Sequence, residues 1–305
     1  MLRNSPDWEV IGVVEPDPEL RAEAQSDEVY QDLPWMTEEE LLSTPGLKAV
    51  AVETSVDQLL NTAHQCIAAG KHIHLDKPPG SSLASFQELL SDADSQQLVV
   101  QLGYMYRYNP GILLLRDLLA KGWLGEVFEI HAVMSKEVGE SKRKRWAKNP
   151  GGTMFELGCH LVDLVVGVLG KPEEVTPYNR RSGQFNDDLQ DNMLAVCSYP
   201  QATATIRSTA LEVEGFDRRH FSVCGTKGTL HIQPLDDPKV QLALSEPHGE
   251  FKSGYQEVTF GPYQRYVADL AELAAIIRGE KPAEYDSAHD LAAQETLLLA
   301  CGLPC

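Results

Sequence analysis

Positive charge is scarce in this chain: 26 Lys and Arg stand against 45 Asp and Glu, so the formal net charge is −19. Such an acidic protein repels nucleic acid and anionic membranes over most of its surface, and we expect neither as the main partner. No apolar stretch reaches the roughly 18 residues of a membrane-spanning helix. Residues 1–7 lack the apolar run typical of a secretory signal.

Cysteine is also sparse and irregularly placed. None of the six cysteines forms a C-x-x-C pair, which argues against a zinc ribbon or a disulfide framework. We therefore expect reduced thiols and a cytoplasmic location. With 43% hydrophobic residues, the 305-residue chain can build real cores, and its length suits two domains of about 150 residues each.

The first hundred residues alternate strand and helix patterns. Thr37 and Glu40 form a capping box, Asp57 is placed to cap a second helix, and Ser82 to start a third. This rhythm predicts a parallel sheet with helices on both faces. The predicted strands are 10–14, 48–52, 72–75 and 98–102.

The pattern changes after residue 103. Asn109-Pro110 is typical of a helix start, and later segments read as successive strands joined by turns, which predicts a largely antiparallel sheet. We predict one domain over 1–103 and another over 104–305. The second should contain helices at 109–121, 153–169, 263–278 and 287–300, and strands at 127–134, 192–199, 202–211, 218–224, 228–233 and 239–244.

Two polar positions follow predicted strands of the first domain, where ligands bind in such sheets. Glu15 could accept hydrogen bonds from both ribose hydroxyls of an adenine dinucleotide and would repel a 2′-phosphate, favouring NAD over NADP. Lys77, within Asp76-Lys77-Pro78, could polarise a carbonyl or stabilise an alkoxide. The alternatives are a solvated loop acid and a surface lysine.

A third candidate is the row Glu156, His160 and Asp163. On a regular helix, at about 100° per residue, these side chains share one face. A neighbouring carboxylate would raise the pKa of His160 and suit it as a general base. A stray histidine on a solvated face is one alternative. A metal site is another, but Glu-x-x-x-His supplies only two ligands, so we predict no metal. The basic run 142–145 reads as a solvated or substrate-facing loop.

Together these segments resemble the Gfo/Idh/MocA oxidoreductase family (glucose-fructose oxidoreductase, inositol dehydrogenase and relatives). The resemblance follows the order of the chain and covers nearly all of it. It is carried by Gly70-Lys71-His72-Ile73-His74-Leu75-Asp76-Lys77-Pro78, Arg107-Tyr108-Asn109-Pro110, Gly122-Trp123-Leu124-Gly125-Glu126-Val127, Gly151-Gly152-Thr153 with Glu156, Gly158, His160 and Asp163, and Gly225-Thr226-Lys227-Gly228-Thr229-Leu230.

The resemblance implies an NAD(P)-dependent oxidoreductase acting on a sugar, a polyol or a related hydroxylated substrate. Lys77 would contact the nicotinamide and the substrate oxygen, His160 would take the hydroxyl proton, and Glu156 would orient or relay. It also implies a homo-oligomer formed through the sheet of the second domain. The implied cofactor-binding residues are Glu15, Thr54, Asp76, Lys77 and Pro78, and the implied substrate-binding residues are Arg107, Asn109 and Asp163.

This chain departs from the family pattern in four ways. The segment after Thr54 reads Ser55-Val56-Asp57, without the Pro-Asn pair that is common there. Asp76 stands where the family usually has Glu, and Glu156 stands where it usually has Asp. No Gly-x-Gly-x-x-Gly occurs in the sequence, whereas family members begin with a strand, this loop and a helix. We expect that unit to precede Met1 in the full protein.

The expected fold is therefore α/β: an incomplete Rossmann-type parallel sheet domain followed by an α+β domain with a large, mostly antiparallel sheet. Two other functions stay open at this point. One is a cofactor-deficient sugar-binding or regulatory relative without catalysis. The other is a metal-dependent lyase or hydrolase that uses Glu156 and His160.

Overall fold

The computed structural model describes residues 2–305. The chain forms two compact units, and each contains segments that are distant in sequence. Unit 1 comprises the residues through Asp76, then Glu88–Gly103 and Tyr266–Ala283. Unit 2 comprises Lys77–Gln87, Tyr104–Arg265 and Glu284–Cys305. The domain boundary between residues 103 and 104 stays a prediction.

Unit 1 contains a parallel sheet of three strands, β1 (Ala49–Val52), β2 (His72–Leu75) and β3 (Val100–Leu102), in that order. Helix α3 (Val56–Ala68) packs on β1 and β2 and buries apolar residues spaced at helical intervals. Its N-cap is Ser55, so the prediction that Asp57 caps this helix was wrong: Asp57 lies in the first turn. The predicted parallel arrangement of these strands is confirmed.

The prediction of a strand over residues 10–14 was wrong. Val13 makes only an isolated bridge to Trp35, through hydrogen bonds of 2.9 Å to the backbone of Pro34 and Met36. Pro34 has no N–H to extend a ladder. Within residues 2–305, β1 hydrogen-bonds to β2 alone among the strands.

The remaining helices of unit 1 begin at local signals. Asp17 caps α1 (Pro18–Gln25), and the predicted capping box of Thr37 and Glu40 opens α2 (Glu38–Leu42). Short 3₁₀ turns occupy Leu2–Asn4 and Glu28–Tyr30. Helix α8 (Ala268–Ile277) starts later than predicted. The Trp8 indole donates to the Leu270 carbonyl of α8 at 2.9 Å, which joins two segments of unit 1 that are distant in sequence.

Unit 2 is built on an eight-stranded sheet in the order β11-β10-β9-β8-β4-β7-β6-β5. All neighbours are antiparallel except β4 and β7, so the largely antiparallel sheet is confirmed. The edge strands β5 and β11 were not predicted. The strands are β4 (Val127–Val133), β5 (Glu174–Arg180), β6 (Asn192–Ser198), β7 (Thr203–Thr209), β8 (His220–Gly225), β9 (Gly228–Ile232), β10 (Val240–Leu244) and β11 (Gly254–Val258).

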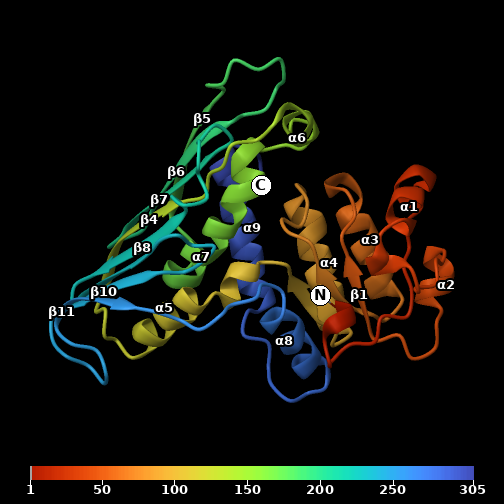
Figure 1. Ribbon diagram of the computed structural model, residues 1–305, viewed down its shortest axis with the longest axis horizontal. Helices are drawn as coiled ribbons and strands as arrows, with labels where there is room; N and C mark the ends of the chain where they lie inside the picture. Colours follow the sequence, from red (N-terminus) through yellow and green to blue (C-terminus); the bar gives the residue numbers. More distant parts are fainter. Residues whose placement is uncertain (1) are drawn as a thin grey trace. The chain divides into compact units, whose positions relative to one another are not determined.

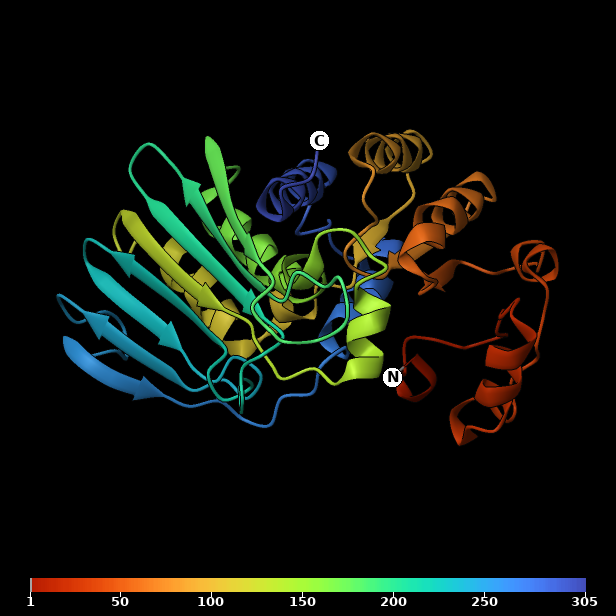
Figure 2. The ribbon, with the colours of Figure 1, turned by 90° about the horizontal axis from the view of Figure 1, so that it is seen from above.

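Helices cover one face of this sheet. α7 (Cys159–Leu169) contacts β4 and β7, and α9 (Ser287–Cys301) contacts β5 and β6. The strands that they cover bury alternate residues such as Ala195 and Ile206, and each large aliphatic side chain buried in this way contributes roughly 1.5–3 kcal/mol. Within residues 2–305 the opposite face carries no helix (Figures 1 and 2).

Three further α-helices lie wholly or partly in unit 2. Asn109 caps α5 (Pro110–Ala120), as predicted. Helix α4 (Leu83–Ser95) passes from unit 2 to unit 1 after Gln87. The prediction of a basic loop was wrong, because its residues lie in α6 (Glu140–Trp146), where buried Arg143 pairs with Asp187 and Asp191. None of the helices in residues 2–305 is long and apolar enough to cross a membrane.

Candidate active site

Lys77 follows the carboxyl end of β2 and reaches a turn of helix far along the chain. Just beyond the last residue pair of β1 and β2, the Asp76 N–H donates a hydrogen bond to the Val52 carbonyl at 2.9 Å. The Lys77 ammonium donates to the backbone carbonyl of Glu156 at 3.2 Å, and Pro78 is buried. Lys77 and Glu156, both in unit 2, are therefore brought together through a main-chain atom, and their catalytic roles stay predictions.

The turn that carries Glu156 is a π-helix, Met154–Gly158, which leads into α7. Its start is fixed to β7 by a reciprocal pair: the Thr153 hydroxyl donates to the Ser208 carbonyl at 3.1 Å, and the Ser208 hydroxyl to the Thr153 carbonyl at 2.9 Å. Turns of this kind are rare and occur frequently at functional sites. The uniform α-helical spacing assumed for Glu156, His160 and Asp163 was therefore wrong.

His160 lies against two tyrosine rings and is 6% exposed. The ring centroids of Tyr104 and Tyr106 are 5.8 Å and 5.0 Å away, both edge-on. Its Nδ1 is buried without a hydrogen-bond partner, and in residues 2–305 the ring makes no hydrogen bond to Glu156 or Asp163. The Glu156 carboxylate instead accepts from the Asn149 amide at 2.6 Å.

The electrostatic prediction for His160 was wrong in sign. Burial lowers its pKa well below the usual value, and the charges of Lys77, Arg219 and Arg265 lower it further. A buried imidazole among cations disfavours the protonated form. His160 is therefore neutral near pH 7, the state in which it can accept a proton.

Asp236 organises the two arginines near His160. It accepts from the Tyr106 hydroxyl at 2.8 Å and from Arg219 at 3.1 Å, and Arg265 also pairs with it. Sequence reasoning missed this acid, because it lies in a loop with no motif around it. Only the tertiary structure brings Asp236, Arg219 and Tyr106 to one place.

Arg107 and Asp163 form a buried ion pair. The Arg107 guanidinium donates to both Asp163 oxygens and, at 2.5 Å, to Asp290 on α9. Burial opposes ionisation of Asp163, but Arg107 and His289 outweigh it and hold its pKa below the usual value. Burial prevails at Asp290, where it raises the pKa.

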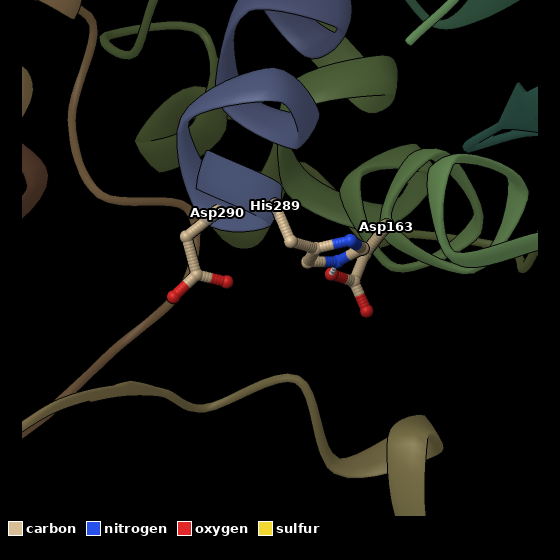
Figure 3. Close-up of side chains that lie close together, drawn as sticks. All are labelled: Asp163, His289 and Asp290. Carbon is tan, nitrogen blue, oxygen red and sulfur yellow. Dashed lines mark hydrogen bonds and ion pairs between the residues drawn. The ribbon is translucent and has the colours of Figure 1, made fainter. Parts of the chain in front are cut away.

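Asp163, His289 and Asp290 also have the spacing of a metal cluster. The His289 ring lies beside the Asp163 carboxylate, and Asp290 is next to it on α9 (Figure 3). Arg107 already places a positive charge between the two carboxylates. A metal ion would have to displace this guanidinium, which argues against a metal centre here.

The predicted substrate-binding residues are engaged by the protein itself. Arg107 and Asp163 form an ion pair with each other, and the side chains of Arg107, Asn109 and Asp163 are almost fully buried. The Asn109 amide donates to the Leu235 carbonyl at 2.8 Å, while its oxygen accepts from the Gly111 N–H at 2.9 Å. Their role in substrate binding stays a prediction.

The predicted cofactor residues of unit 1 lie where its chain segments end or turn. Thr54 is exposed just after β1, and Asp76 directly follows β2. One Glu15 oxygen accepts from the Asp17 N–H at 2.9 Å, which leaves the second for a ribose hydroxyl. The roles of these residues in holding a dinucleotide stay predictions.

The fold combines a unit of parallel strands and helices with a unit built on a large antiparallel sheet. Together with a lysine at a strand end and a buried histidine, this is typical of a nicotinamide-dependent oxidoreductase with a Rossmann-type domain. Residues 1–104 match the oxidoreductase family with an NAD-binding Rossmann fold. Residues 112–231 match the GFO/IDH/MocA C-terminal domain. The chain belongs to the Gfo/Idh/MocA oxidoreductase family, which confirms the resemblance and the fold class.

Individual relatives are distant. The chain is 27% identical over 216 residues to trans-1,2-dihydrobenzene-1,2-diol dehydrogenase of Sus scrofa, with 70% of this chain and 63% of that protein covered. It is 27% identical over 291 residues to the uncharacterized oxidoreductase YdgJ of Escherichia coli, with coverage of 90% and 81%. An NAD-binding oxidoreductase structure from Klebsiella pneumoniae superposes with a TM-score of 0.79 at 16% identity, covering 95% of this chain and 86% of that one.

Proposed function

We propose that this protein is a dehydrogenase that moves a hydride between a nicotinamide cofactor and a hydroxylated carbon of a sugar, polyol or related substrate. The observation that carries the proposal is the pairing of Lys77, fixed on the Glu156 carbonyl at 3.2 Å, with the buried, neutral His160 whose pKa Lys77 helps to lower. The diol in the name of the mammalian relative is consistent with such a substrate.

The chain's own residues would divide the reaction between them. His160 accepts the hydroxyl proton of the substrate, and the edges of Tyr104 and Tyr106 hold its ring. The Lys77 ammonium stabilises negative charge on the substrate oxygen. Glu156 acts chiefly through its backbone carbonyl, which positions Lys77, with its carboxylate held by Asn149.

The cofactor supplies the hydride acceptor when bound. Glu15, Thr54, Asp76 and Pro78 would hold it together with Lys77, which directly follows Asp76 in the chain. Glu15 favours NAD over NADP because its carboxylate would repel a 2′-phosphate. A cytoplasmic homo-oligomer, formed through the helix-free face of the unit 2 sheet, belongs to the same proposal.

One observation favours a second candidate, a relative that binds sugars without catalysis. The printed sequence contains no Gly-x-Gly-x-x-Gly, the loop that usually cradles the pyrophosphate. The two candidates differ in whether the protein reduces a nicotinamide cofactor.

The test is reduction of NAD⁺ and NADP⁺, followed at the absorbance of the reduced nicotinamide, with a panel of neutral and acidic sugars and polyols. We expect turnover with NAD⁺, and a loss of at least about 100-fold in kcat for His160→Gln. His131→Gln, at an exposed histidine of β4, is the matched control and should keep the full rate. Sugar binding without cofactor reduction would support the second candidate instead.

A further inference from the structure

Two lysines of unit 2 converge on one tryptophan. Lys136 follows β4, and its backbone N–H donates to the Thr209 carbonyl at 3.1 Å. Its ammonium lies 5.4 Å from the centroid of the Trp146 ring, and the Lys142 ammonium lies 5.2 Å from the same ring. Phe216 adds a second aromatic ring 5.8 Å from Lys136. Both positive charges are thus held together by aromatic rings.

Neither lysine has an acidic partner, although the chain carries 45 Asp and Glu. In residues 2–305 no carboxylate forms an ion pair with Lys136 or Lys142. Burial lowers the pKa of Lys136 to about 8, and the charges of Lys142, Arg219 and Lys77 contribute. Crowded ammonium groups of this kind repel one another, and a bound anion would relieve the repulsion.

These lysines are connected to the candidate active site. Arg219 lies 3.9 Å above the Phe216 ring, and its Nε donates at 3.1 Å to the carbonyl of Ser135, the residue before Lys136. Arg219 also pairs with Asp236, which accepts from Tyr106, whose ring touches His160. A continuous series of contacts therefore leads from His160 to Lys142.

The charge of this region opposes that of the molecule. Five basic side chains contribute to it, Lys77, Lys136, Lys142, Arg219 and Arg265. Asp236 pairs with the two arginines, and Glu212 pairs with Arg218. The whole chain has a net charge of −19, so a local cation cluster attracts one small anion rather than a polyanion such as nucleic acid. Ammonium and guanidinium groups are the usual protein ligands of carboxylates and phosphates.

We propose that the substrate is an acidic sugar or polyol, whose carboxylate or phosphate is bound by Lys136 and Lys142 while its hydroxyl lies at His160. This inference rests on the proposed function, because it places the reacting hydroxyl at His160. It narrows the substrate class from hydroxylated compounds in general to those that carry an anionic group away from the reacting carbon.

The test is calorimetric titration of the whole chain with matched probes: D-glucuronate, D-glucose 6-phosphate, D-glucose and inorganic phosphate. We expect both acidic sugars to bind at least about tenfold more tightly than glucose. K136Q should remove most of this preference. K144Q, which makes the same change of charge at an exposed lysine of the same helix region, should change affinity less than about twofold.

Three results would overturn the proposal: no preference for the acidic sugars, equal effects of K136Q and K144Q, or inorganic phosphate binding as tightly as the phosphosugar. The carboxylate and phosphate arms show which anion is preferred. Because binding is measured without turnover, a failure of this inference can be told apart from a failure of the proposed dehydrogenase function. If acidic sugars bind in a Lys136-dependent way but no cofactor is reduced, the proposed dehydrogenase is contradicted and this inference is kept. If the cofactor is reduced but acidic sugars are not preferred, the dehydrogenase is kept and this inference is contradicted.

Discussion

The Lys77 ammonium donates a hydrogen bond to the backbone carbonyl of Glu156, 3.2 Å away, and not to its carboxylate. A side-chain change at Glu156 therefore leaves this contact in place. The π-helical turn that contains Glu156 presents the carbonyl, so the fold of the turn, more than the charge of the residue, fixes the lysine.

This relationship separates the effects of two substitutions. Lys77→Met should lower kcat by roughly 100-fold or more, because the charge that stabilises the substrate oxygen is lost. Glu156→Gln should lower kcat less than about tenfold, since the carbonyl remains and the Gln oxygen can still accept from Asn149. Initial rates on both variants check this, and equal losses would show that the Glu156 carboxylate takes part in the chemistry.

The buried network around Arg107 should dominate the stability of unit 2. Arg107→Met leaves Asp163 and Asp290 without their shared partner and should cost about 3–5 kcal/mol of unfolding free energy. Arg116→Met breaks the more exposed pair with Glu284 and the contact of Arg116 with the Tyr285 ring, and it should cost about 0–1 kcal/mol. Urea unfolding measures both, and similar small losses would contradict the structural importance assigned to the buried pair.

The glycine pair before the π-helical turn should not tolerate a side chain. Gly152 has φ +56°, and a Cβ there would lie 2.5 Å from the Gln190 carbonyl oxygen. Gly122, which follows the C-cap of α5, has φ +68° with open space around it. Gly152→Ala should therefore cost roughly 1–3 kcal/mol more than Gly122→Ala. Thermal or urea unfolding compares them, and equal costs would mean that the backbone near Gly152 can shift.

His160 should make folding sensitive to mild acid. Its pKa is lowered in the fold by burial and nearby cations, while the unfolded chain titrates near 6.5. Below that pH the unfolded state gains a proton that the fold resists, so stability falls. Between about pH 7 and about pH 5.5 the wild type should lose roughly 1 kcal/mol more than His160→Gln. His72, His74 and His220, whose pKa values burial also lowers, are present in both proteins. Urea unfolding of both proteins at the two pH values provides the measurement. If the wild type and His160→Gln lose the same unfolding free energy, His160 is solvated rather than buried.

Local signals in the sequence were sufficient for part of the fold. The Thr37–Glu40 capping box and the Asn109-Pro110 helix start are short-range chemistry, and both occur as predicted. The edge strand β5 was missed because its residues alternate poorly in burial and include Pro177, which edge strands tolerate.

The sequence predicted which residues belong to the candidate site, but not their local geometry or electrostatics. Lys77 and His160 could be found because the family motifs carry them. The π-helical turn could not, since a regular helical projection assumes constant rotation per residue. The cations that lower the pKa of His160 come from Arg219 and Arg265, far along the sequence, so the sign of the shift depended on tertiary contacts. Asp236 and Lys136 were missed for the same reason.

The proposed reaction depends on neutral, buried His160 as its base. The pH dependence of kcat/KM, measured with the best substrate of the panel, tests it most directly. We predict that kcat/KM stays constant as the pH falls through 6.5, the ordinary histidine value, declines only at lower pH, and loses that acidic limb in His160→Gln. An acidic limb at or above 6.5, or one that persists unchanged in His160→Gln, would contradict the account.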